Sequence, residues 1–276
     1  GMNEKGIVMS EIGDHYGDEK ETLEGEPFIF LARRLLEEVG WLAFGVIEGI
    51  RIIFKESERI DVIYTTSPPH SVHLIGYWLK ILTRKPWVAD FRDPWALSPW
   101  WGEDERKTVK YKISSFLERR VLKKADKVIF NTSHTAREYL AYYGEQGSKF
   151  VVIPNGFDPG ELKDLDPNLE RKFSSKLTLI HAGTLYRKRD PFPLIEAISL
   201  LQRRGVLSQD NFHLLLIGKV TMEKSLKRRI QELGLSQMVT ISPSISRRRC
   251  LELMMNSDVL VLIQPGTRLQ VPAKLY

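Results

Sequence analysis

The stretch that decides the fold reads Ile180-His181-Ala182-Gly183-Thr184-Leu185-Tyr186-Arg187-Lys188-Arg189-Asp190. An apolar run over residues 177–180 leads into it, and a helical pattern over residues 191–201 follows it. Gly183 lets the main chain approach a ligand closely, and the start of a helix offers free N–H groups. The three consecutive cations supply positive charge. The pattern indicates a phosphate-binding turn, and a solvated strand–helix turn explains a single glycine equally well.

The same alternation of apolar runs and helical patterns extends over most of the chain. We expect strands at residues 61–65, 87–91, 127–131, 150–153, 177–181, 212–217, 239–241 and 258–263. Helical patterns lie between them, at residues 71–83, 104–124, 132–143, 191–204, 222–233 and 246–256. Short loops between strands and helices imply parallel sheets that are covered on both faces. A polar segment with prolines and glycine divides the chain into an N-terminal domain (1–157), a linker (158–175) and a C-terminal domain (176–276).

The composition narrows the class of partner and the compartment. The net charge of +6 suggests anionic partners such as nucleic acid, acidic lipid or sugar phosphates. Acidic residues are interspersed through most of the chain, so no stripe typical of nucleic-acid binding stands out, and we expect no nucleic-acid partner. The single cysteine, Cys250, excludes an internal disulfide framework and fits a reducing, cytoplasmic location.

The apolar run over residues 28–54 is long enough to span a bilayer, but its charges argue against that. It contains Arg33, Arg34, Glu37, Glu38, Glu48 and Arg51. Its apolar positions recur at helical spacing, which predicts one or two amphipathic helices. Such helices suit peripheral docking near a membrane surface, and packing against a core explains them equally well. Acidic sequence precedes the run, opposite to the basic start of a secretory signal.

Eight short motifs resemble, in their order, those of nucleotide-sugar glycosyltransferases with the GT-B fold, and in particular the large retaining family four. They cover roughly residues 60 to 276 and are Asp61–His70, Phe91–Trp95, Ala125–Ser133, Val152–Asp158, Ala182–Leu185, Leu215–Gly218, Ser257–Val261 and Val271–Tyr276. The resemblance implies an α/β fold in which two Rossmann-like domains face each other across a cleft. No Gly-x-Gly-x-x-Gly stands at a strand–helix turn, which disfavours an NAD-binding protein instead.

The resemblance also implies roles in the C-terminal domain. Transfer of a sugar leaves negative charge on the departing nucleoside diphosphate, which Arg and Lys side chains stabilise. The family has an Arg just after the loop glycine and a Lys about a turn later, whereas this chain has Thr184 at the first position and Arg189 best aligned with the second. The residues expected to bind the donor are Gly183, Thr184, Arg187, Lys188, Arg189, Gly218 and Lys274.

In the N-terminal domain, the resemblance places candidate catalytic residues after the strand at 87–91. The family often has a His there, and this chain has Arg92 followed by Asp93. Arg92 would pair with an anion and Asp93 with sugar hydroxyls, unless the two only fix the loop over Trp95. Ser67 and His70 are candidates for lining the acceptor side, or for capping a helix. His73 is expected on a helix face without a role in the chemistry.

The acidic motif of the donor domain departs from the family. One expected Glu position holds Leu269, and the second would follow Tyr276, where the chain stops; residues 1–60 also match the family poorly. We therefore expect a glycosyltransferase that is short in its second domain. It would move a sugar, with retention, from a nucleotide-diphosphate sugar to a glycan or lipid-linked acceptor. The alternative is a nucleotide-sugar-binding module without turnover. No metal site and no cofactor beyond the donor substrate are expected.

Overall fold

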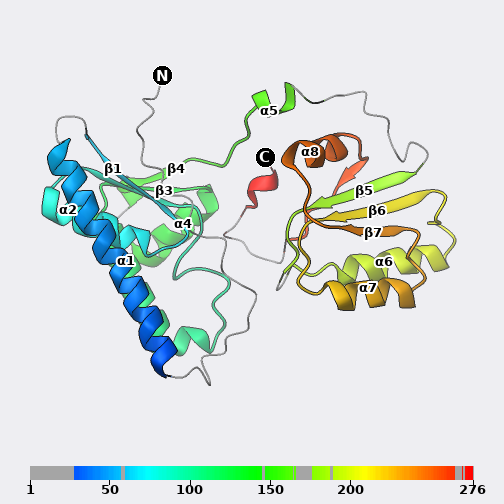
Figure 1. Cartoon of the computed structure of the whole chain (residues 1–276), viewed down its shortest axis with the longest axis horizontal. Coiled ribbons are helices and arrows are strands. Elements are labelled where there is room, and N and C mark those ends of the chain that lie inside the picture. Colours follow the sequence, from blue (N-terminus) through cyan, green and yellow to red (C-terminus); the bar gives the residue numbers. More distant parts are fainter. Residues whose placement is uncertain are drawn as a thin grey trace. The chain divides into compact units, whose positions relative to one another are not determined.

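A computed structural model gives the three-dimensional structure of the chain. It describes residues 28–56, 60–144, 147–163, 165, 176–186, 189–264, 269 and 271–275, with the backbone alone for residues 28–38. The chain divides into two compact units (Figure 1). The first comprises residues 1–155 with a return segment at 268–271, and the second comprises residues 156–267 and 272–276. In the first unit, the hydroxyl of Thr135 donates to the carbonyl of Leu269 at 2.8 Å, which holds the return segment.

The first unit alternates strands and helices around a four-stranded parallel sheet. Its strands are β1 (Ile63–Ser67), β2 (Trp87–Phe91), β3 (Lys127–Phe130) and β4 (Phe150–Val152), and they lie in the order β1-β2-β3-β4. Its α-helices are α1 (Phe28–Lys55), α2 (Val72–Thr83), α3 (Val109–Lys124) and α4 (Ser133–Tyr143). Two short 3-10 turns, η1 (Glu105–Lys107) and η2 (Gly147–Lys149), complete it.

The core of the first unit lies on one face of this sheet. Trp87, Ala89 and Phe91, at alternate positions of β2, are fully buried there together with residues of α1 to α4. The positions in between, Val88 and Asp90, lie on the other face and are only half-buried. Thr66 and Asp90 are half-buried and hydrogen-bonded at 2.9 Å. The described helices thus contribute their core residues to one face of this sheet, and the expected cover on the other face stays a prediction.

Helix α1 packs beside α2. Gly45 and Gly49 of α1 face Ile75 and Leu79 of α2, so closely that a Cβ on either glycine would clash with those side chains. Other residues of α1 also pack on the core, namely Trp41, Leu42, Val46, Ile50 and Ile53. Core packing therefore accounts for much of its apolar pattern. No helix in the described ranges has the length and apolar character needed to cross a bilayer.

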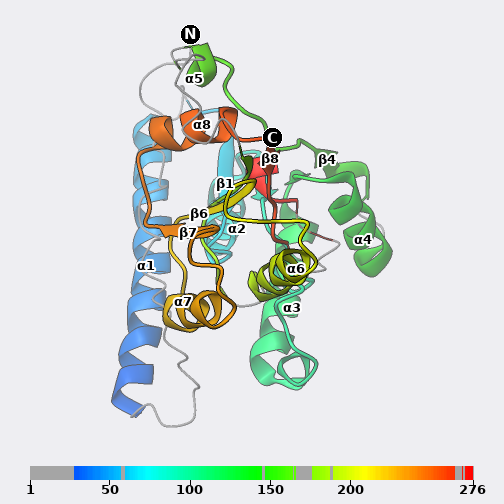
Figure 2. The ribbon, with the colours of Figure 1, turned by 90° about the vertical axis from the view of Figure 1, so that its right-hand side faces the viewer.

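The second unit contains another four-stranded parallel sheet, in the order β7-β6-β5-β8. Its strands are β5 (Leu177–Ala182), β6 (Phe212–Ile217), β7 (Val239–Ser242) and β8 (Val259–Leu260). Its helices are α5 (Gly160–Lys163), α6 (Phe192–Arg203), α7 (Glu223–Glu232), α8 (Arg247–Met255) and the 3-10 turn η3 (Ala273–Leu275). Helices α6 and α7 lie on one side of the sheet and α8 on the other (Figures 1 and 2), as expected for a parallel sheet.

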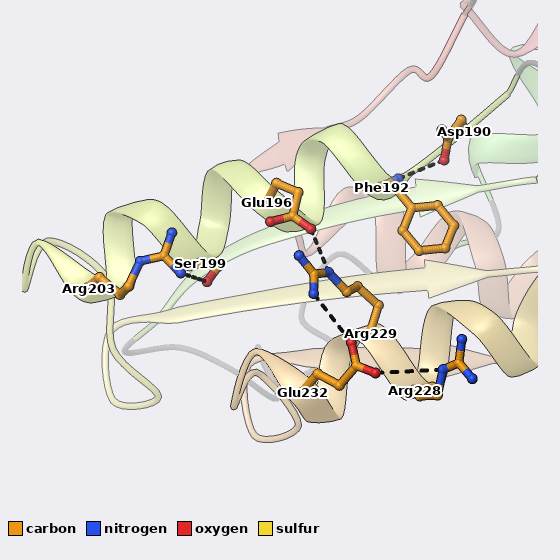
Figure 3. A network of polar contacts seen from close by, with 8 residues as sticks. All are labelled: Asp190, Phe192, Glu196, Ser199, Arg203, Arg228, Arg229 and Glu232. Atoms are coloured by element: carbon orange, nitrogen blue, oxygen red, sulfur yellow. Dashed lines mark hydrogen bonds and ion pairs between the residues drawn. The ribbon is translucent and has the colours of Figure 1, made fainter.

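An ion-pair network joins α6 to α7 (Figure 3). Arg229 of α7 donates to Glu196 of α6 at 2.7 Å and also pairs with Glu232. At the start of α6, the carboxylate of Asp190 accepts a hydrogen bond from the backbone N–H of Phe192 at 2.9 Å. That contact fixes the backbone where the turn after β5 ends, next to Arg189.

Two elements differ from the sequence-based expectation. The helical pattern over residues 104–124 is broken at Thr108, whose backbone is extended and whose hydroxyl caps α3 by accepting from the N–H of Tyr111. The last strand is two residues long, Val259–Leu260, where the pattern predicted a strand over residues 258–263. Pairing with β5 ends at Leu260, and Val259, Leu260 and Leu262 are exposed, so the apolar run is not covered as a buried strand would be.

Candidate functional site

Two glycines stand side by side at the carboxyl end of the second sheet. Gly183 follows β5 and Gly218 follows β6, and their φ angles are +137° and +125°. A Cβ on Gly218 would lie 2.6 Å from the carbonyl oxygen of Gly183. Backbone in this conformation is nearly restricted to glycine, and the contact leaves no room for a side chain. The chain therefore keeps bare main chain at the sheet edge where ligands of open α/β sheets bind.

A lysine reaches this edge from the end of the chain. Nζ of Lys274 donates to the carbonyl of Ala182, the last residue of β5, at 3.1 Å. A Cβ on Gly183 would stand 2.8 Å from the same nitrogen, so the absence of a side chain at Gly183 makes room for the ammonium group. Burial and the nearby Arg189 guanidinium lower the pKa of Lys274. An ammonium group that is pushed toward neutrality gains from a bound anion.

Arg189 provides a second cation at the same edge. Its guanidinium lies over the ring of Tyr186, 5.0 Å from the ring centre. Its Nε is buried and has no hydrogen-bond partner among the described residues. A buried donor without an acceptor is costly, and an oxygen of a bound phosphate would satisfy it.

His181 lies beneath this pair of cations and stays neutral. It is fully buried, and its Nδ1 donates to the carbonyl of Val261 at 3.0 Å. Burial, followed by the positive charge of Lys274, lowers its pKa to about 4. The described part of the edge thus combines two cations with a neutral imidazole, an arrangement suited to a doubly charged anion such as a diphosphate.

In the first unit, the candidate residues lie at the end of β1 and in the loops after β1 and β2. The hydroxyl of Ser67 is buried and points to the carbonyl of Asp90 at 3.5 Å. The ring of His70 stacks on Trp95 with the ring centres 5.4 Å apart and the planes 7° from parallel. Burial lowers the pKa of His70 to about 4, and its buried Nδ1 has no partner within the described ranges. His70 is therefore a neutral ring held against the loop that follows β2.

Arg92 begins that loop with an exposed side chain. Its carbonyl accepts a hydrogen bond from the side chain of Asn131 at 2.7 Å. Arg92 is also near enough to Tyr64 to oppose the rise of the Tyr64 pKa to about 12, which burial and then Asp90 cause. Asp93 is half-buried beside Arg92. His73, expected on a helix face, is fully buried under this region and bonded to Thr65 at 2.8 Å.

A buried carboxylate that the sequence analysis missed anchors the same loop. Glu118 of α3 is fully buried and accepts from the N–H of Ala96 at 3.2 Å, and from the hydroxyls of Tyr139 and Tyr143 at 2.5 Å each. The hydroxyl of Tyr139 in turn accepts from the N–H of Trp95 at 3.0 Å. Burial raises the pKa of Glu118 to about 7. The sequence does contain a signal for this burial. Glu118 lies three and four residues before the apolar Val121 and Leu122, on the same face of the predicted helix.

Each of the two predicted groups of site residues lies within one unit. Gly183, Gly218, Arg189 and Lys274 meet at one sheet edge, with Thr184 exposed next to them. Arg187 and Lys188 lie outside the described residues. Ser67, His70, Arg92 and Asp93 belong to the other unit. Their catalytic and acceptor-side roles stay predictions, as does the expectation that no metal or cofactor is used.

Two parallel α/β units, one of them with a basic edge around paired glycines, have the architecture of the glycosyltransferases with the GT-B fold. The chain belongs to Glycosyltransferase Family 4, whose sequence profile matches residues 11–161. The profile of the glycosyl transferases group 1 matches residues 163–264.

Relatives and solved structures agree with this assignment. A D-inositol 3-phosphate glycosyltransferase of Paenarthrobacter aurescens is 25% identical over 154 residues, which are 52% of this chain and 36% of that protein. Anabaena Alr3699/HepE in complex with UDP superposes with a TM-score of 0.54 at 18% identity, over 77% of this chain and 55% of HepE. A glycosyltransferase of Rickettsia africae gives 0.55 at 19% identity, over 79% and 55%. The chain thus spans about a third to a half of the length of these proteins.

Proposed function

We propose that the chain carries the donor-binding part of a sugar transferase that uses a nucleoside-diphosphate sugar. The observation that carries this proposal is the pair of cations, Lys274 and Arg189, at the glycine-lined edge after β5. The described part of that edge provides two cations beside glycine main chain that carries no side chains, and both features suit a diphosphate. The structural neighbour HepE, from the same fold class, is described in complexes with UDP and with UDP-glucose.

The chemistry follows from where charge develops. The bond between the anomeric carbon and the β-phosphate oxygen breaks, and its electron pair leaves with the nucleoside diphosphate. The acceptor hydroxyl oxygen forms the new bond to the same face of the sugar, which retains the configuration, and its proton leaves with the diphosphate. Lys274 and Arg189 stabilise the charge on the leaving group, a role that fixed cations perform strongly in a partly buried site. This role for the side chains is our reason to propose that transfer needs no metal ion.

The acceptor is proposed to be a glycan or a lipid-linked sugar, bound on the side of Ser67 and His70. The neutral imidazole of His70 and the flat ring of Trp95 stack face to face, which is a surface suited to a sugar ring. Arg92 and Asp93 are proposed to contact the reacting groups from the loop after β2. The curated relatives are named for an inositol phosphate acceptor, which carries hydroxyls and a negative charge.

The test is to incubate the whole chain with UDP-glucose and a soluble glycan acceptor and to follow UDP release. Proton NMR of the product then gives the anomeric configuration. The proposal predicts release of UDP and an α-linked product from the α-linked donor. A β-linked product would contradict retention, and binding of UDP-glucose with no release would leave binding without turnover as the function.

That second candidate, a nucleotide-sugar-binding module, rests on one observation. The position where the family has a Glu holds Leu269, whose carbonyl is engaged by Thr135 in the first unit. No carboxylate at that position is therefore available to hold the donor sugar. Hydrolysis of UDP-glucose at a rate above that of Arg189→Ala would exclude the module.

A further inference from the structure

We propose that Glu118 is a positioning residue for sugar transfer, which acts through Tyr139 on the loop that follows β2. The loop comprises residues 92–101, and its first two residues are Arg92 and Asp93. This role rests on the proposed function, because these two residues are proposed to contact the reacting groups. It adds the buried side chains that hold them in place.

The two oxygens of the Glu118 carboxylate have different partners. Oε1 accepts from the backbone N–H of Ala96 at 3.2 Å and from the hydroxyl of Tyr139 at 2.5 Å. The hydroxyl of Tyr139 in turn accepts from the backbone N–H of Trp95 at 3.0 Å. Oε2 accepts from the hydroxyl of Tyr143 at 2.5 Å. Oε1 therefore reaches two consecutive N–H groups of the loop, one directly and one through Tyr139.

Tyr139 ties the loop to the core of the first unit. Its side chain is fully buried, and its ring centre lies 4.7 Å from that of Phe130 on β3 and 6.0 Å from that of Phe91 on β2. A ring packed in this way has little freedom to follow a movement of the loop. The hydroxyl of Tyr139 therefore places the N–H of Trp95 relative to the sheet.

The backbone is held on both sides of Asp93. The side-chain nitrogen of Asn131 donates to the carbonyl of Arg92 at 2.7 Å. At the other side, the N–H of Trp95 is held by Tyr139, and the carbonyl of Trp95 accepts from the indole N–H of Trp101 at 2.9 Å. A short segment between two fixed points has few conformations. The anchors thus restrict where the side chains of Arg92 and Asp93 can lie, as a reacting group requires.

A carboxylate at position 118 does what an apolar side chain could not do. Glu118 is fully buried, and burial raises its pKa to about 7. A buried polar group loses its hydration, and an apolar side chain of similar volume often serves stability equally well. An apolar side chain, however, cannot accept hydrogen bonds from Ala96 and Tyr139. A satisfied buried network favours one conformation of the backbone that it binds.

Two tyrosine variants separate positioning from stability. Y139F removes the hydroxyl that joins Glu118 to the N–H of Trp95, whereas Y143F removes a hydroxyl that is bonded to Glu118 and to Ser115. Each variant keeps its ring and loses two hydrogen bonds, so the thermal midpoints should fall by similar amounts. Only Y139F frees a loop N–H. Hydrogen–deuterium exchange of the loop amides should therefore be faster in Y139F than in Y143F.

The functional measurement is release of UDP from UDP-glucose, with water in place of the acceptor hydroxyl. We expect kcat to fall about 10- to 100-fold in Y139F and to stay within about twofold in Y143F, since a small displacement of groups that contact the reacting atoms has effects of this size. The affinity for UDP should stay within about twofold in both variants, because the nucleotide edge lies in the other unit.

Two variants of Glu118 complete the design. E118Q keeps an acceptor oxygen for the loop and presents its amide to Tyr143, whose hydroxyl can accept. It should therefore retain kcat within about threefold and the slow exchange of the loop amides. E118A removes the acceptor and should resemble Y139F.

The outcomes distinguish this role from the proposed function. Equal kcat in Y139F and Y143F, or equal exchange of the loop amides in both, would overturn the positioning role of Glu118. A wild type that binds UDP-glucose without releasing UDP would refute sugar transfer itself, and with it any role of Glu118 in that reaction.

Discussion

The ammonium group of Lys274 occupies the space that a side chain on Gly183 would fill, 2.8 Å from the Cβ position. This relationship joins the first distinctive residue of the turn after β5 to a residue almost at the end of the chain. Lys274 also donates to the carbonyl of Ala182, so a hydrogen bond holds the lysine at the carboxyl end of β5. The glycine is thus required by the lysine as well as by its own backbone conformation.

Substitution of glycines by alanine should separate these two requirements. Gly234 has a positive φ of +68° with open space around it, Gly183 faces a movable lysine, and Gly218 faces the carbonyl of Gly183. We expect G234A to cost about 1 kcal/mol in free energy of unfolding, G183A about 1–2 kcal/mol and G218A about 3 kcal/mol or more. Urea denaturation measures all three.

Of these glycine variants, only those at the sheet edge should change the affinity for nucleotides. We expect G183A to weaken UDP binding about tenfold, because the new methyl displaces the ammonium group. G234A, which lies at the end of α7, should bind UDP as the wild type does. A G183A protein with full affinity for UDP would mean that the position of Lys274 does not matter.

Glu118 should prove essential to the loop that carries Arg92 and Asp93. Glu118→Ala removes the acceptor of three hydrogen bonds and leaves the buried donors of Ala96, Tyr139 and Tyr143 unsatisfied. We expect a loss of about 3–5 kcal/mol in the free energy of unfolding, since each such donor costs about 1–3 kcal/mol and the site relaxes in part. Glu118→Gln keeps one acceptor oxygen and should lose about 1–2 kcal/mol. Similar losses for both variants would argue against the hydrogen bonds as the cause.

Two buried groups, His70 and Glu118, should make the free energy of unfolding depend on pH in opposite directions. His70 has a pKa of about 4 in the folded state and 6.5 otherwise, so the unfolded state binds an extra proton between these values. The contribution of His70 to the free energy of unfolding is therefore complete above pH 6.5 and is lost as pH falls toward 4. The loss is up to about 3 kcal/mol, at about 1.4 kcal/mol per pH unit. Glu118, with its pKa raised from 4.5 to about 7, acts oppositely and lowers stability as pH rises from 4.5 to 7.

Two variants separate the contributions of His70 and Glu118 to the pH dependence of stability. His70→Phe keeps the stack on Trp95 and should reduce the loss of stability as pH falls from 6.5 to 4, which is the acid arm of the profile. Glu118→Gln should reduce the loss of stability as pH rises from 4.5 to 7. His73, bonded to Thr65 and with its pKa lowered to about 3 by burial and then by His70, keeps part of the acid arm in both variants. Midpoints of urea unfolding at a series of pH values give the slopes. An acid arm that is as steep in His70→Phe as in the wild type would contradict the assignment.

Nucleotide binding should not depend on divalent metal ions. The charge at the edge comes from Lys274 and Arg189, and we expect the UDP affinity to be the same with excess EDTA and with magnesium. Calorimetry under both conditions measures this. If UDP binding were lost in EDTA and restored by magnesium, a metal ion would have to bind the diphosphate together with these side chains, which would contradict the prediction.

The sequence predicted the elements of the fold well, because its signals are local. Apolar runs place β2 and β6 at the observed residues, and side chains of Thr132 and Ser246 cap α4 and α8. The faces of the first sheet were less predictable. Which side of a short strand is covered depends on helices distant in sequence, and Asp90 and Thr66 bond to each other rather than pack under one.

The candidate site was predictable where glycine and charge mark it and not where burial does. Gly183, Arg189 and Lys274 carry signals in their residue types. His181 and Glu118 gain their character from surroundings that become visible only in the folded chain: a neutral imidazole under two cations, and a carboxylate beneath two tyrosine hydroxyls. Residues 187 and 188 of the predicted cation run lie outside the described structure.

Calorimetric titration of UDP into the whole chain tests the central claim most directly. The wild type should bind, and Arg189→Ala and Lys274→Ala should each weaken binding by about 1.5–3 kcal/mol, the range for a charge-assisted contact. Arg228→Ala, which removes a cation of α7 away from the edge, should leave the affinity within about twofold. Equal affinity in all four proteins would contradict the assignment of the β5 edge as the diphosphate site.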